Sequence, residues 1–78
     1  MNMSSPLLQS EVLEIIKSRN SIRFEELFKE ARKVDADVEE KDISRVLMKL
    51  ELLGIVTVTR LAKKNFLIEF VKKEQSAI

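Results

Sequence analysis

The chain of 78 residues is long enough for one small domain with a single core, which its 45% hydrophobic content can fill. It contains no cysteine, no histidine and only one glycine. Disulfides, thiolate metal sites and glycine-rich phosphate loops are therefore excluded, and the commonest general base is missing. We expect neither an enzyme nor a cofactor-binding protein.

The net charge of +1 conceals an asymmetry between the two halves of the chain. Residues 1–40 carry a net charge of −3 and residues 41–78 carry +4, which points to a polyanionic partner for the basic half. No stretch has the pattern of a signal peptide or a membrane span. We expect a cytoplasmic protein, nucleoid-associated if it binds DNA, with no membrane partner and no small-molecule substrate. The Lys- and Glu-rich composition also fits a thermophile.

The first predicted element is a helix that opens at Ser5 and Pro6 and ends at Asn20. Ser5 suits the N-cap, Pro6 suits the first helical position, and Asn20 suits a helix terminator. Basic side chains in the last turn complement the helix dipole. The stripe predicted to face the core consists of Leu8, Val12, Ile15 and Ile16, widened by Leu13.

The second predicted helix, residues 24–33, follows a short extended link over residues 21–24. Its acidic first turn and basic last turn match the helix dipole. Helical spacing predicts a buried face made of Phe24, Leu27, Phe28 and Ala31.

The third predicted helix begins near Val38, because Asp37 and Glu40 have the spacing of a capping box. It runs to about Leu53 and ends at Gly54, the residue most at ease in the left-handed conformation that closes a helix. Its core face is predicted to hold Ile43, Val46, Leu47, Leu50 and Leu53.

Two β-branched, alternating segments at residues 55–60 and 66–71 predict strands, joined by the basic segment 61–65. Phe66, Ile68 and Phe70 alternate with other side chains, so one face of the second strand should point inward. The sequence therefore ends in a β-hairpin with a basic tip.

This order of elements, together with the stretch DISRVLMKLELLGIV at residues 42–56, resembles the winged helix-turn-helix family. The resemblance covers roughly residues 7–71. It implies an α+β, mainly helical fold: three helices plus a C-terminal two-stranded β-hairpin wing. We expect one domain over residues 1–78, with an ordered core at about 6–72 and flexible termini. The positions that carry the resemblance are Ile43, Val46, Leu47, Leu50, Gly54, Ile55 and Val56.

In that family the third helix lies in the major groove of DNA and the wing touches the backbone or the minor groove. On a helical wheel, Lys41, Arg45 and Lys49 lie roughly 160°, 200° and 240° from the core direction. We predict that they contact phosphates or base edges, with Arg45 best suited to a bidentate guanine contact and Ser44 adding a hydrogen bond. The alternative is an ordinary solvated helix face.

The wing carries the remaining predicted DNA contacts. We expect Arg60, Lys63 and Lys64 to hold the hairpin against a neighbouring run of phosphates. The sequence thus predicts a small winged-helix protein that binds double-stranded DNA and regulates transcription or the genome.

Met48 and Leu52 fall at roughly 140° and 180° on the same wheel, between the cations. Three interpretations stay open. The chain's own C-terminal residues Val71, Ala77 and Ile78 could cover the pair, the pair could contact thymine methyl groups, or it could form a protein interface. The last defines the alternative function: a docking module or subunit of a larger assembly, because winged helices serve both roles. A homodimer is compatible with either function.

Overall fold

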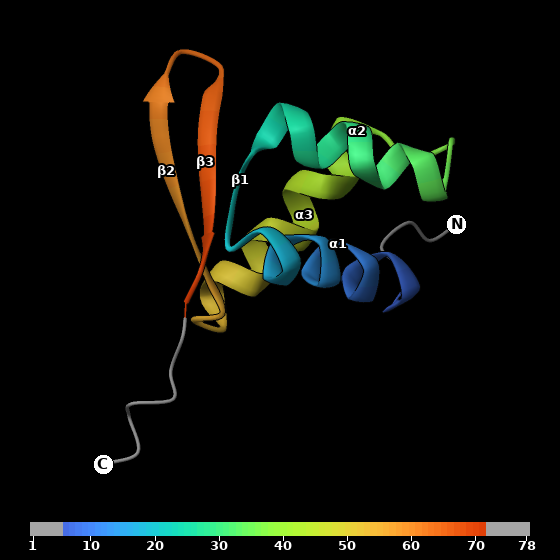
Figure 1. Ribbon diagram of the computed structural model, residues 1–78, viewed down its shortest axis with the longest axis horizontal. Coiled ribbons are helices and arrows are strands. Elements are labelled where there is room, and N and C mark those ends of the chain that lie inside the picture. Colours follow the sequence, from blue (N-terminus) through green and yellow to red (C-terminus); the bar gives the residue numbers. More distant parts are fainter. Residues whose placement is uncertain (1–5, 72–78) are drawn as a thin grey trace.

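Three helices precede a C-terminal hairpin, as Figure 1 shows in the computed structural model, which describes residues 6–71. The predicted fold class is confirmed: the protein is α+β and mainly helical, with a small antiparallel sheet and a winged-helix-like topology. The predicted N-cap Ser5 lies outside the described residues. The elements are α1 (Pro6–Arg19), β1 (Ser21–Arg23), α2 (Phe24–Val34), α3 (Glu40–Leu52), β2 (Val56–Ala62) and β3 (Asn65–Phe70).

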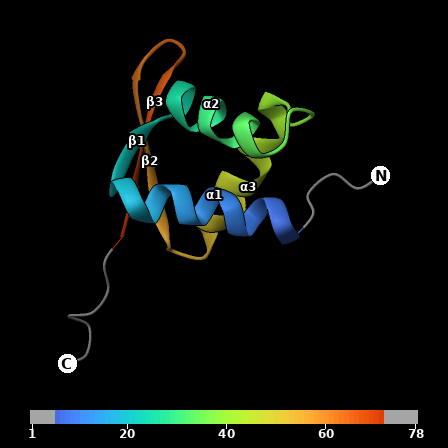
Figure 2. The ribbon, with the colours of Figure 1, turned by 45° about the vertical axis from the view of Figure 1, so that its right-hand side comes forward.

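The sheet has the strand order β1-β3-β2, so β3 lies at its centre. The segment predicted only as an extended link is β1, which pairs with β3 in antiparallel register. Ile68 of β3 lies opposite Ile22 of β1 on one side and Val58 of β2 on the other. All three helices pack against this sheet, while the far end of the hairpin projects beyond them (Figures 1 and 2).

The core lies between the helices and the inner face of the sheet. The predicted face of α3 is confirmed except at Leu53, which is exposed because it is the C-cap, where the chain leaves the helix. Phe24 and Phe28 are only partly buried, so α2 contributes less to the core than its pattern predicts. The buried residues are Leu8, Val12, Ile16, Ile22, Leu27, Ala31, Val38, Ile43, Val46, Leu47, Leu50, Val56 and Ile68.

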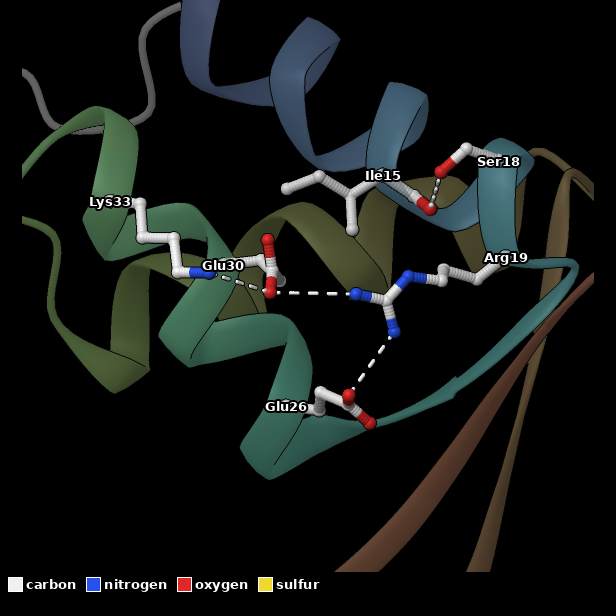
Figure 3. A network of polar contacts seen from close by, with 6 residues as sticks. All are labelled: Ile15, Ser18, Arg19, Glu26, Glu30 and Lys33. Atoms are coloured by element: carbon white, nitrogen blue, oxygen red, sulfur yellow. Dashed lines mark hydrogen bonds and ion pairs between the residues drawn. The ribbon is translucent and has the colours of Figure 1, made fainter.

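The end of α1 is tied to α2 by a network of ion pairs around Arg19 (Figure 3). Its guanidinium lies 3.1 Å from the carboxylate of Glu26 and 3.4 Å from that of Glu30, which Lys33 also reaches at 3.2 Å. Asn20 ends the helix as predicted, with a positive φ of 67°. Partly exposed pairs contribute about 1 kcal/mol or less each, so the network orients α2 more than it stabilises the fold.

The start of α3 differs from the prediction. Glu39, not Asp37, is the N-cap, and its backbone N–H donates to the carboxylate of Asp42 at 2.9 Å. The backbone N–H of Asp37 instead donates to the side chain of Asp35 at 3.1 Å. Val38 is buried before the helix begins. Residues 35–38 form a turn, closed by the N–H of Val38 donating to the carbonyl of Asp35 at 3.2 Å, and the first helical residue after it is Glu40.

The end of α3 is as predicted. Gly54 adopts a φ of 78°, in the left-handed region where a Cβ atom would be strained. Its N–H donates to the carbonyl of Glu51 at 3.0 Å. The N–H of Ile55 donates to the carbonyl of Leu50 at 2.9 Å. These two bonds form a Schellman motif. The N–H of Val71 donates to the carbonyl of Ile55 at 2.9 Å, which fixes the base of the hairpin beside α3.

Candidate nucleic-acid interface

Lys41, Arg45 and Lys49, here called the outer stripe, are exposed on the side of α3 opposite its buried face. Within residues 6–71, Arg45 and Lys49 form neither an ion pair nor a side-chain hydrogen bond. The ammonium of Lys41 lies 3.7 Å from the carboxylate of Glu39, a long and exposed pair of little energetic consequence. The helical wheel therefore placed these three side chains correctly in solvent.

Two apolar side chains are interleaved with the outer stripe. Met48 is 60% exposed and Leu52 is 83% exposed. Leu53, which helical spacing assigned to the core, is 60% exposed at the C-cap of the helix. Of the C-terminal residues considered as a cover, Val71 is half-buried, and Ala77 and Ile78 lie outside the described residues. The pair is open to solvent over the part of the chain that the structure describes.

The hairpin tip, residues 61–65, presents Lys63 and Lys64 in the turn between β2 and β3, where both are exposed. Arg60 has another role. Its guanidinium donates to the backbone carbonyls of Ala62 at 3.4 Å and Lys63 at 3.3 Å. These bonds close the tip where the register of β2 shifts between Arg60 and Ala62. Arg60 thus shapes the loop that carries the two lysines.

A groove of about 630 Å³ separates α3 from the hairpin. It brings Lys41 and Ser44 of α3 together with Lys64 of the hairpin. Arg45, Lys49, Arg60 and Lys63 do not line it. Apolar side chains from α2, α3 and both hairpin strands form the rest of its wall, namely Phe24, Leu47, Met48, Val58 and Phe66.

Carboxylates also line the groove and the hollow at the hairpin tip. Glu40 and Glu51 line the groove beside the cations, so the flank of α3 that they occupy faces the hairpin. Glu25 of α2 and Glu40 also line a hollow with the tip lysines. Within the groove the two carboxylates balance the charges of Lys41 and Lys64, so the positive charge of α3 that remains lies at Arg45 and Lys49. The sequence alone does not show that Glu40 and Glu51 face the hairpin, because this depends on where the hairpin packs.

The described residues hold no group of three or more His, Cys, Asp or Glu that could bind a metal ion. None of their helices has the length and apolarity needed to cross a membrane. The side chains of this surface carry ammonium, guanidinium, carboxylate, hydroxyl and apolar groups.

Three helices followed by an antiparallel hairpin, within a sheet completed by β1, define a winged-helix-like fold. Comparisons of the chain with models of protein families, with curated proteins and with solved structures found no match. Since a fold of this kind hosts several functions, the functional argument depends on the side chains described above.

Proposed function

We propose that this protein binds double-stranded DNA, with the outer face of α3 in the major groove and the hairpin against the backbone, in a role in transcription or genome regulation. The observation that carries the proposal is the exposure of Lys41, Arg45 and Lys49 on one face, two of them without a partner in residues 6–71. Cations left unpaired on a helix surface are available to neutralise phosphates.

The geometry of the stripe suits a groove. An α-helix with its side chains is about 10–12 Å across, and the major groove is about 12 Å wide, so the groove admits the outer face of α3. The guanidinium of Arg45, at the centre, has the fork that matches a guanine edge. Lys41 and Lys49, one turn away on each side, would meet the flanking phosphates. The tip lysines of the hairpin would contact the next stretch of backbone.

The salt dependence of binding tests this proposal. With about four to six phosphate contacts, the logarithm of the association constant should fall by about 4–5 units per tenfold increase in salt. Between about 50 and 200 mM salt, affinity should therefore drop roughly 250- to 1,000-fold. The measurement is fluorescence anisotropy with a labelled duplex of random sequence. Absence of binding at the lower salt concentration, or binding insensitive to salt, would contradict the proposal.

Protein docking is the second candidate function, and the exposure of Met48 and Leu52, one turn apart on α3, favours it. Under this alternative, the double substitution Met48→Lys with Leu52→Lys should abolish association with the partner protein, because each change places a charge in the apolar contact. Duplex affinity should be unchanged or higher. Capture from cell extract with wild-type and double-variant protein, compared by mass spectrometry, measures the first effect. Weakened DNA binding with all protein contacts intact would exclude this function.

A further inference from the structure

The outermost line of α3 is not purely basic. Met48 and Leu52 lie roughly 140° and 180° from the core direction, on either side of Lys41 at about 160°. Leu52 thus points about as directly away from the core as Lys41 does, and it is 83% exposed. Scattered exposed leucines are ordinary in proteins. Two apolar side chains one turn apart, with Arg45 and Lys49 on one side and Glu51 of the groove on the other, form a defined surface.

We propose that Met48 and Leu52 make this protein prefer thymine-containing DNA, by contacting the C5-methyl groups of thymine in the major groove. This inference rests on the proposed binding of duplex DNA. Thymine is the one standard base that presents an apolar group on its major-groove edge. Met48 and Leu52 on the outer face of α3 would contact the thymine methyl groups. The cations on one side of the pair would contact the adjoining phosphates of the DNA backbone.

The charges beside the pair favour DNA over a second copy of this chain. Arg45 and Lys49 adjoin it and have no partner within residues 6–71. Pairing two copies through this face would take two cations of each copy out of water, and Glu51, which adjoins the pair, could compensate only one of them. A stable protein interface also buries about 800 Å² on each partner, with 20–30 residues a side. Two aliphatic side chains cannot supply that area.

The energetic scale sets the expected effect. Removing one methyl group from a buried apolar contact changes affinity by about fourfold. One or two methyl contacts should therefore give a thymine preference of about 4- to 15-fold. Anisotropy titrations can measure such a ratio. It is smaller than the change in affinity that salt causes through the phosphate contacts.

The test uses two duplexes of the same alternating A·T sequence, about two helical turns long, one made with thymine and the other with uracil. These duplexes differ only in the C5-methyl groups. Wild-type protein should bind the thymine duplex about 4- to 15-fold more tightly in anisotropy titrations at low salt. Conversely, 5-methylcytosine in an alternating G·C duplex restores a methyl group at C5 and should strengthen binding.

Protein variants assign the effect to the two side chains. Met48→Ala and Leu52→Ala should each bring the thymine-to-uracil ratio closer to one, and together they should abolish it. Leu7→Ala truncates an exposed leucine of α1 and should leave the ratio unchanged. Circular dichroism verifies that all variants are folded. The comparison of the thymine and uracil duplexes with wild-type protein tests the inference even if a variant fails to fold.

Three results would overturn the inference. Equal wild-type affinity for thymine and uracil duplexes would exclude methyl contacts and leave the proposed DNA binding intact. A thymine preference that persists in the double alanine variant would assign the effect to DNA shape, not to Met48 and Leu52. Failure to bind either duplex at low salt would refute both this inference and the proposed function.

Discussion

Replacing Ile68 by alanine is expected to lower the free energy of unfolding by about 2–5 kcal/mol. Ile68 is 0% exposed, lies on the central strand β3, and is flanked by Ile22 and Val58 on the neighbouring strands. A domain of this size has a total stability of only about 4–12 kcal/mol, so the variant loses a large part of it. Urea unfolding followed by circular dichroism measures the change, and the melting temperature should fall by about 10–30 °C.

Leu52→Ala is the matched control, since it also shortens an aliphatic side chain but at a position exposed to solvent. Its stability should stay within about 0.5 kcal/mol of the wild type. A loss below about 1 kcal/mol for Ile68→Ala would contradict the placement of β3 between β1 and β2. Equal losses in both variants would show that Leu52 is covered.

Local patterns were sufficient for most of the fold. Helical and alternating spacings placed the three helices and the hairpin, and Gly54 marked the end of α3 because few residues tolerate its positive φ. The start of α3 was missed for a physical reason. The segment from Asp37 to Asp42 contains two overlapping capping patterns, and the first is not used because Asp37 and Val38 belong to a turn that bonds back to Asp35.

The sequence likewise predicted only some features of the candidate site. The exposure of the outer stripe was predictable, because a helical wheel needs only the local periodicity. Three features needed the tertiary structure: the acidic flank that faces the hairpin, the bonds of Arg60 within its own tip, and the exposure of Leu53 at the C-cap. The first depends on how the hairpin packs against α3, whereas the other two depend on the exact conformation of a turn and of a helix end, which residue spacing alone does not fix.

Neutralising the outer stripe should have the largest effect on DNA binding. In a triple variant with Lys41, Arg45 and Lys49 all replaced by glutamine, duplex affinity should fall roughly 100- to 1,000-fold at about 0.1 M salt. Each lost phosphate contact removes the release of about 0.9 counterion, which is worth nearly tenfold at that concentration. The slope of log affinity against log salt should shrink by about 2–3. Anisotropy titrations at several salt concentrations measure both quantities.

The matched control replaces Lys17, Lys29 and Lys33 by glutamine, which removes the same net charge from exposed positions on α1 and α2. Because salt screens charges beyond about 10 Å, this variant should bind within about threefold of the wild type. Both triples change only exposed side chains, so both should remain folded, and the control loses one weak ion pair between Lys33 and Glu30. If the two triples weaken binding equally, affinity follows the net charge of the molecule and α3 has no special part in it. A selective loss in the first triple would locate the DNA contact on the outer face of α3, where the unpaired cations lie.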